Sequence, residues 1–546
     1  MTPHLGPAGG RPTRRGDGAG RRSGAGRPAA GDRRGPAPRP TTRRPPVPDP
    51  ARRAVLDLLA AVRGGAFANL ALPRLIDRHR LAGRDAALAT ELGYGTCRVL
   101  GQLDAVLDAC SSRPLGEVDG VALDALRLGA YQLLHTRIPP HAAVSATVEQ
   151  VRLGERPEAA GFVNAVLRRV AERDLTGWAA ALAPALDDDP IGHLSFVTAH
   201  PRWITAALAD ALEADPAPTT PDVTDEPTVE PTVEPDPSAD LPADLPTEVP
   251  AGLPTDLPTA LQADDVAPRV HLVARPGRID RDELLVQCRD TGLRAQPGRW
   301  SQYAVVLEGG DPARLPAVVA GTAAVQDEGS QLVAAALAAV PLDGPDAHWL
   351  DLAAGPGGKA ALLGSLAALR GADVVAIEPI EHRADLVRRA TAGLPVRVQV
   401  ADGRATGLPA GSFDRVLLDA PCTGLGALRR RPEARWRRTP GDVADLVALQ
   451  QQLLDAALEL VRPGGVVGYV TCSPHLAETV EVVQAVTGTD GTDGPDGSAP
   501  DRPAVRLLDA RAHLPGVTGL GDGPSVQLWP HRHGTDAMFL ALLQRT

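Results

Sequence analysis

Two cysteines follow apolar, strand-like runs in the C-terminal half of the chain. Cys422 lies in "VLLDAPCTGLG" (416–426), and Cys472 lies in "VVGYVTCSP" (466–474). A thiolate attacks electron-poor carbon atoms readily, and a thiol at a strand end is better placed for such a reaction than one inside a strand. A single cysteine is more often a small buried hydrophobe. Asp419, three positions before Cys422, and the polar residues beside Cys472 favour a chemical role here.

A glycine-rich turn, "DLAAGPGGKA" (351–360), follows another strand-like run and precedes an apolar helical stretch. Backbone N–H groups at such a turn can approach a ligand closely. Glu378 ends the next strand-like run and Asp402 ends a third, where carboxylates accept hydrogen bonds from a ribose. The turn matches neither a Walker A loop nor GxGxxG. The set predicts a nucleoside-containing cofactor; ordinary tight turns with solvated acids are the alternative.

Two further segments carry polar residues near these motifs. The segment "LRRRPEARWRR" (428–438) holds six arginines and Trp436, a mixture that suits a phosphate backbone and a stacked base, although a charge run is usually a solvated face. In "WPHRHGTDAMFLALL" (529–543), His531, His533 and Asp536 precede the last strand. No further ligand is spaced to complete a metal site, so we expect no metal and a structural or substrate-positioning role.

Strands and helices alternate from 346 to 546, which predicts a doubly wound α/β sheet with ligands at the carboxyl ends of its strands. The expected strands lie in "HWLDLAA", "DVVAIEP", "VRVQVAD", "DRVLLDAP", "GGVVGYVTC" and "AMFLALL". Before this domain, residues 269–345 mix short strand-like runs with one helical run and predict a small α+β subdomain.

The N-terminal part predicts an all-α domain over 51–212. Val55, Leu58, Leu59 and Val62 follow the i, i+3, i+4, i+7 spacing of an amphipathic helix. The same spacing recurs within 123–134 and 162–170, which favours several packed helices.

Three segments have compositions that disfavour a packed core. Residues 1–50 carry eleven Arg against three Asp and predict a disordered basic arm, either a solvated tail or one weakly attracted to RNA. Residues 213–268 carry fourteen acidic residues and dense proline, and predict a disordered, extended linker or surface insertion without helix or strand. The stretch 487–503 predicts a loop.

Length and composition bound the remaining possibilities. A chain of 546 residues allows about two to four domains. The five cysteines include no CxxC pair, which argues against a disulfide framework and a zinc site. The sequence contains no long apolar run, so nothing in it indicates secretion or a membrane span. We therefore expect a cytoplasmic protein, and because the net charge is −11, any nucleic-acid surface must be local.

Together these motifs resemble the RsmB (Sun/Fmu) family of 16S ribosomal RNA cytosine-C5 methyltransferases. The resemblance spans about 51–212 and 269–546. It rests on the cofactor loop "DLAAGPGGKA", the Pro-Cys motif "LLDAPCTGLG", the Thr-Cys motif "VTCSP", the lead-in "VQDEGSQL" (325–332), the segment "RRRPEARWR" and the C-terminal "PHRHGTDAMFLA". The helical region resembles the NusB-like RNA-binding domain of this family, and 346–546 its Rossmann-like class I methyltransferase domain.

The resemblance implies S-adenosylmethionine as cofactor and small-subunit ribosomal RNA as partner, for a protein that we expect to be a monomer. Cofactor contacts are implied for Ala353, Ala354, Gly355, Pro356, Gly357, Gly358, Lys359, Glu378, Asp402 and Asp419. The chain departs from the family pattern at Ala353, Gly355, Glu378 and Thr479, where Cys, Ala, Asp and Asn are common.

The implied reaction begins with thiolate addition to carbon 6 of cytosine, assigned by the family to the Thr-Cys motif and hence to Cys472. Asp419 would stabilise charge at ring N3, Lys359 would orient the base or Asp419, and Cys422 would assist product release. A methyltransferase for transfer RNA or 23S RNA with the same residues, and a non-catalytic RNA-binding factor, are the alternatives.

Overall fold

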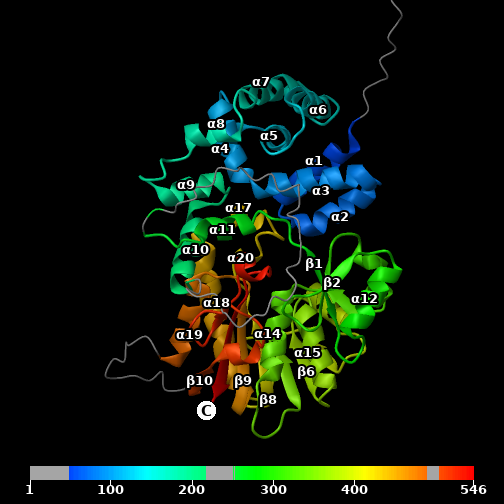
Figure 1. Cartoon of the computed structure of the whole chain (residues 1–546), viewed down its shortest axis with the longest axis vertical. Coiled ribbons are helices and arrows are strands. Elements are labelled where there is room, and N and C mark those ends of the chain that lie inside the picture. The colour runs from blue at the N-terminus through cyan, green and yellow to red at the C-terminus, as the bar shows by residue number, and fades with distance from the viewer. Residues whose placement is uncertain (1–47, 217–249, 251, 489–502) are drawn as a thin grey trace, which may run out of the picture. The chain divides into compact units, whose positions relative to one another are not determined.

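The computed structural model describes residues 48–216, 250, 252–488 and 503–546 (Figure 1). The predictions for the basic arm, for most of the acidic segment and for the loop at 487–503 therefore concern residues that lie largely outside these ranges. Within the described ranges, none of the helices combines the length and the apolar character that a membrane span requires.

The N-terminal domain is helical, as predicted, and is drawn in blue to green in Figure 1. Val55, Leu58 and Leu59 are buried on one face of α1, as the spacing predicts, and pack against buried leucines such as Leu103 and Leu126. The helices are α1 (Pro50–Arg63), α2 (Ala68–Arg78), α3 (Gly83–Arg98), α4 (Leu100–Cys110), α5 (Gly120–Leu134), α6 (Pro140–Arg152), α7 (Ala160–Val170), α8 (Leu175–Leu182), α9 (Pro190–Val197) and α10 (Arg202–Ala214).

One helix contradicts the prediction that the acidic segment 213–268 contains no regular structure. Helix α11 (Leu257–Ala263) forms at its C-terminal end and buries Leu257, Pro258 and Leu261. Proline is tolerated in the first turn of a helix because that turn has no intrahelical partner for its N–H groups. Pro258 occupies this position, so the proline starts the helix instead of breaking it.

The small α+β unit that the sequence predicts over 269–345 is present. Its antiparallel sheet has the strand order β2-β3-β1-β4. The elements are β1 (Val270–Ala274), α12 (Arg281–Asp290), β2 (Ala295–Pro297), β3 (Ala304–Leu307), α13 (Pro316–Val319), β4 (Ala323–Val325) and α14 (Glu328–Ala339). Helix α14 packs on the large sheet that follows and thereby connects the two units.

The C-terminal domain is built on a mixed sheet with the order β10-β12-β9-β8-β5-β6-β7 and with β11 paired to β12. The central strands from β9 to β7 are parallel, whereas β12 is antiparallel to β9 and to β10. The strands are β5 (His348–Asp351), β6 (Asp373–Ile377), β7 (Val396–Gln399), β8 (Phe413–Asp419), β9 (Val461–Thr471), β10 (Val505–Leu508), β11 (Val526–Gln527) and β12 (Phe539–Arg545).

Helices cover both faces of this sheet, as predicted for a doubly wound fold. Alternate residues of β8 point to opposite faces: Leu417 packs with residues of α14 and α15, and Val416 and Leu418 pack with residues of α18 and α19. The helices are α15 (Gly358–Ala368), α16 (Glu381–Ala390), α17 (Ala434–Arg437), α18 (Pro440–Leu460), α19 (Val480–Thr487) and α20 (Pro530–His533). The parallel strands therefore present their carboxyl ends at one edge, where the motifs lie.

Candidate active site

The two cysteines of the sequence motifs meet beyond the carboxyl ends of the neighbouring parallel strands β8 and β9. Their Sγ atoms lie 3.4 Å apart, and both residues are half-buried, whereas the other three cysteines are buried. The backbone N–H of Gly426 donates to the carbonyl oxygen of Cys472 at 2.9 Å, which ties the two loops together. The structure therefore brings together Cys422 and Cys472, which are 50 positions apart in the sequence.

The two thiols differ in acidity. The hydrogen bond from Cys422 lowers the pKa of Cys472, and the nearby charges of Lys359 and Arg431 act in the same direction. The pKa of Cys422 is raised well above its ordinary value by the same hydrogen bond, by burial, and by the negative charges of Glu478 and Asp419. Because the thiolate is the nucleophilic form, Cys472 is the better nucleophile of the pair.

Lys359 and Asp419 form an ion pair beside the thiols. Nζ of Lys359, in the first turn of α15, lies 2.8 Å from Oδ2 of Asp419, the last residue of β8. Burial opposes the charged form of Lys359, but the Asp419 carboxylate outweighs this effect and the pKa of Lys359 is raised. The side chain of Asp419 is 29% exposed, so a substrate can reach the carboxylate.

Asp351 is a buried acid at this site that the sequence reasoning did not select. It ends β5, is fully buried, and in the described part of the chain its Oδ2 atom has no hydrogen-bond partner. Burial and then the charge of Asp419 raise the pKa of Asp351 to about 7. Its position at the start of the glycine loop was visible in the sequence, but its burial was not.

Replacing Asp351 with asparagine is expected to raise the melting temperature more at pH 8 than at pH 5. A carboxyl whose pKa is raised on folding contributes stability that is fully present below its ordinary pKa and is lost as the pH rises through the folded-state pKa of about 7. Asparagine does not ionise, so the gain of Asp351→Asn should widen by at least about 2 °C over this range. Thermal denaturation at both pH values measures it. The exposed Asp290→Asn should show no such trend, and a constant difference for Asp351→Asn would contradict the assignment.

The glycine loop and Glu378 are in close contact. A Cβ atom on Gly355 would lie 2.0 Å from Oε2 of Glu378, so a larger residue at this position would require the Glu378 side chain to move. Gly357 has a φ of +109° and precedes α15, so backbone N–H groups of the first turn are presented to the site. Arg383 Nη2 donates to the Gly355 carbonyl at 2.9 Å and lies 3.5 Å from Oε2 of Glu378.

Asp402 lies beyond the end of β7, at the same edge of the sheet as Glu378. Its carboxylate is partly exposed and pairs with Arg404, whose hydrogen bonds lower the pKa of Asp402 to about 2. A Cβ atom on the adjacent Gly403 would lie 3.0 Å from the carbonyl oxygen of Leu352 in the glycine loop. The loop, Glu378 and Asp402 therefore form one contiguous cradle, and their donors and acceptors fit a nucleoside-containing cofactor.

The segment 428–438 does not offer Trp436 for stacking on a base, contrary to what its sequence suggests. Nε1 of Trp436 donates to the carbonyl oxygen of Arg98 at 2.8 Å, and a Cβ atom on Gly101 would lie 2.1 Å from the indole ring. Arg435 is fully buried and pairs with Asp265 at 2.8 Å. The interpretation of Trp436 as a residue that stacks on RNA is wrong, because the missing side chain of Gly101 leaves a space in the helical domain that this ring fills.

Other arginines of this segment also contact the protein. Arg437 donates to the carbonyl oxygen of Val62 at 2.6 Å, near the end of α1, and Arg438 donates to the carbonyl oxygen of Thr423 at 3.2 Å. The segment therefore links the helical domain to the residue that follows Cys422. Arg431 remains exposed and is the member of the run best placed to meet a phosphate.

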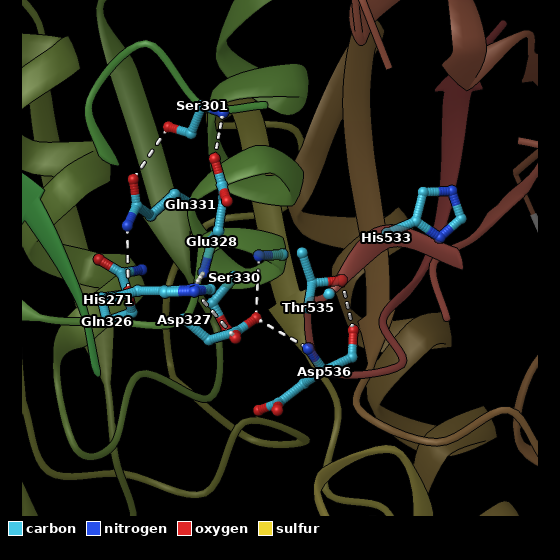
Figure 2. Close-up of polar contacts among 12 residues, drawn as sticks. His271, Ser301, Gln326, Asp327, Glu328, Ser330, Gln331, His533, Thr535 and Asp536 are labelled. Carbon is cyan, nitrogen blue, oxygen red and sulfur yellow. Dashed lines mark hydrogen bonds and ion pairs between the residues drawn. The ribbon is translucent and has the colours of Figure 1, made fainter. Parts of the chain in front are cut away.

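The lead-in motif and the C-terminal motif contact each other (Figure 2). Asp327 and Asp536 each form ion pairs with both Arg429 and Arg430. The carboxylate of Asp327 also accepts a hydrogen bond from the backbone N–H of Asp536 at 3.2 Å. His533 instead bonds to the backbone of Trp529 and Thr518. Figure 2 shows the His533 ring apart from the Asp327–Asp536 contact. Asp536 therefore holds the segment that follows the Pro-Cys loop, whereas His533 holds the backbone of the C-terminal segment itself.

Comparison with protein families gives two matches. The 16S rRNA methyltransferase RsmB/F family matches residues 339–544, and the NusB family matches residues 49–172. "Ribosomal RNA small subunit methyltransferase B" of Salmonella paratyphi B (strain ATCC BAA-1250 / SPB7) is 32% identical over 416 residues, which cover 75% of this chain and 83% of the relative.

The chain belongs to the RsmB/F methyltransferase family. A protein of Mycobacterium tuberculosis (strain ATCC 25618 / H37Rv), named "Putative methyltransferase Rv1407", is 51% identical over 514 residues, covering 94% of this chain and 98% of the relative. The crystal structure of PH0851 has the same fold, with a TM-score of 0.70 at 18% identity over 92% of this chain and 100% of that chain. The predicted methyltransferase with an N-terminal NusB-like domain is thereby confirmed.

Proposed function

We propose that this RsmB/F family member transfers a methyl group from S-adenosylmethionine to carbon 5 of a cytosine in 16S ribosomal RNA through a covalent cysteine–cytosine adduct. The observation that carries the proposal is the pair of thiols 3.4 Å apart, beside the Lys359–Asp419 ion pair. A methyltransferase that acts on a more nucleophilic atom has no need of this arrangement.

The chemistry of the base explains the need for a thiolate. Carbon 5 of cytosine is a poor nucleophile, but thiolate addition to carbon 6 turns the ring into an enamine whose carbon 5 can attack an electrophilic methyl group. Cys472, whose pKa is lowered, makes this addition. Lys359 donates a hydrogen bond to Asp419 at 2.8 Å. Together the two residues stabilise the charge that develops at ring N3. The target base must be extruded from its stack to reach this site.

The cofactor cradle lies next to these groups. S-adenosylmethionine supplies a methyl group on a positively charged sulfur. The residues that would hold this cofactor are the loop Ala353 to Lys359, the carboxylates Glu378 and Asp402, which would bind the ribose, and Asp419, which lies nearest the thiols. Ile380 and Val400 are exposed apolar side chains just beyond β6 and β7, and they offer a surface for a purine ring.

Product release requires removal of the carbon 5 proton. After its own thiol proton has passed to a water molecule, Cys422 accepts the carbon 5 proton directly or through a water molecule; the electron pair of the C–H bond restores the ring double bond, the bond from carbon 6 to Sγ of Cys472 breaks, and Cys472 leaves as a thiolate. The high pKa of Cys422 suits this step, because a thiolate of high pKa is a stronger base.

The choice of small-subunit ribosomal RNA rests on the printed name of the Salmonella relative and on the family's printed description. The helical domain, which matches the NusB family, is the proposed second RNA contact. We further propose that the protein is cytoplasmic, since five free cysteines are typical of a reducing compartment. A monomer is proposed as well.

The test offers the purified protein and labelled S-adenosylmethionine three RNA pools that lack the modification: 16S ribosomal RNA, 23S ribosomal RNA and transfer RNA. We expect label on carbon 5 of a cytosine in the 16S pool, and bisulfite sequencing of RNA from a deletion strain should lose one 5-methylcytosine at the same position. Transfer confined to 23S or transfer RNA would change the substrate, and label on any other atom would refute the mechanism.

A further inference from the structure

Glu478 is a fully buried carboxylate that the proposed reaction does not use. It lies in a short helical turn, η5 (Leu476–Glu478), six positions after Cys472. Its Oε1 atom accepts hydrogen bonds from the backbone N–H of Thr423 at 2.7 Å and from Nε2 of Gln450 at 3.1 Å. Its Oε2 atom accepts from the hydroxyls of Thr423 and of Ser473, the latter at 2.7 Å.

The donors to Glu478 come from both cysteine motifs. Thr423 directly follows Cys422, and Ser473 directly follows Cys472. The two hydroxyls also lie 3.2 Å from each other. One carboxylate therefore joins the two loops at the residue next to each thiol.

Helix α18 also holds Glu478 and the Pro-Cys loop, through Gln450. Nε2 of Gln450, midway along the helix, donates to the carbonyl oxygen of Pro421 at 2.9 Å as well as to Glu478. The hydroxyl of the buried Tyr469 in β9 donates to the backbone carbonyl oxygen of Glu478 at 2.8 Å. Both ends of the Glu478 residue, side chain and backbone, are thus fixed by elements of the sheet and its covering helix.

Physical chemistry makes the carboxylate hard to replace. A carboxylate is an acceptor with no proton to donate, and here every neighbour is a donor. Removal of the carboxylate leaves buried donors unpaired, at a cost of about 1–3 kcal/mol for each such group. An apolar residue at this position would therefore release the two loops from each other.

We propose that Glu478 is a positioning residue that holds Cys422 and Cys472 within hydrogen-bonding distance and keeps Cys422 in its thiol form. The first effect follows from the hydrogen bonds above. The second follows from charge, since a buried carboxylate opposes ionisation of a neighbouring thiol. The two Sγ atoms lie 3.4 Å apart, so a Cys422 thiol that keeps its proton can donate it to Cys472.

The first experiment measures how closely the thiols are held, without RNA or cofactor. Diamide oxidises a thiol pair to a disulfide by taking up two electrons and two protons, which reduces its N=N bond to a hydrazine. Glu478→Ala is expected to slow closure of the Cys422–Cys472 disulfide, followed by mass spectrometry of peptides, by at least about tenfold. Asp414→Ala is the matched control, because Asp414 is also a buried carboxylate that accepts two backbone N–H groups, at the opposite end of β8.

Glu478→Gln separates geometry from charge. Its carbonyl oxygen can keep Thr423 N–H and Gln450, and its NH₂ group can donate to the two hydroxyl oxygens, which also accept. Disulfide closure should therefore stay within about threefold of the native rate. Because the charge is lost, the pH midpoint for alkylation of Cys422 by iodoacetamide should move to lower pH.

The outcomes decide the proposal separately from the proposed function. Closure at the native rate in folded Glu478→Ala, or an unchanged alkylation midpoint in Glu478→Gln, would overturn it; if the alanine variant does not fold, the glutamine variant decides alone. A fall in methyl transfer of about 100-fold in Glu478→Ala, the effect of misplacing reacting groups by about 1 Å, rests on the proposed function. The thiol measurements do not, since they hold for any activity at this site.

Discussion

Replacing Cys472 with alanine is expected to abolish methyl transfer to RNA, with a loss of ~10⁴-fold or more, the scale observed when a covalent nucleophile is removed. The physical reason is that carbon 5 of the cytosine does not become nucleophilic until carbon 6 carries the thiolate. Cys472 is the member of the pair whose pKa is lowered. Cys472→Ala should therefore also form no denaturant-stable complex with the RNA, as judged on a denaturing gel with labelled RNA.

Cys422→Ala should give the opposite phenotype. Addition by Cys472 and methyl transfer can proceed, but the base that removes the carbon 5 proton is missing, so the protein–RNA adduct should accumulate and turnover should stop after about one cycle. Cys288→Ala is the matched control, because Cys288 is buried in the small α+β unit, and it should behave as the native protein. An adduct in Cys472→Ala would exchange the two roles, and continued turnover in Cys422→Ala would remove Cys422 from the mechanism.

The parts of this site that the sequence predicts are those that local patterns specify. The strands β5, β6, β8 and β9 each contain a short apolar run and end at or just before a polar residue. Because parallel strands place their carboxyl ends at one edge, the residues after them could be grouped without coordinates. Asp419, Cys422 and Cys472 are identified in this way, and in the structure the two Sγ atoms lie 3.4 Å apart.

The parts that the sequence reasoning missed depend on contacts between distant segments. Nothing near Trp436 indicates that its ring fills the space left by Gly101, 335 positions earlier, so the arginine-rich segment resembles an RNA contact when only the sequence is considered. No local pattern distinguishes Glu478 from other acidic residues, and its function in the structure comes from the donors Thr423 and Gln450. Burial of a charged group is a property of the packed fold, and a single sequence carries no local signal for it.

The ion pair of Lys359 and Asp419 leads to the second large expected effect. Asp419→Asn keeps the size of the side chain but cannot hold or pass a proton at ring N3, and it removes the charge that raises the pKa of Lys359. Methyl transfer is expected to fall by ~10²–10⁴-fold, the usual contribution of general acid–base catalysis. Methyl transfer by Lys359→Met should fall by a similar factor, since Asp419 then lacks its partner at 2.8 Å.

The combination of these two variants is the sharper measurement. If Lys359 and Asp419 act as one unit at N3, the double variant should transfer the methyl group only slightly more slowly than the less active of the two single variants. The reason is that the second substitution removes a group that has already lost its function. Arg388→Met breaks a partly exposed ion pair with Glu381 and should leave single-turnover rates unchanged. Rapid-quench assays of adduct formation locate the defect: the pair assists thiolate addition, so the adduct should form as slowly as the methyl group is transferred. Fast adduct formation followed by slow methylation would instead place Lys359 and Asp419 in the methyl-transfer step, at the boundary between the base and the cofactor cradle.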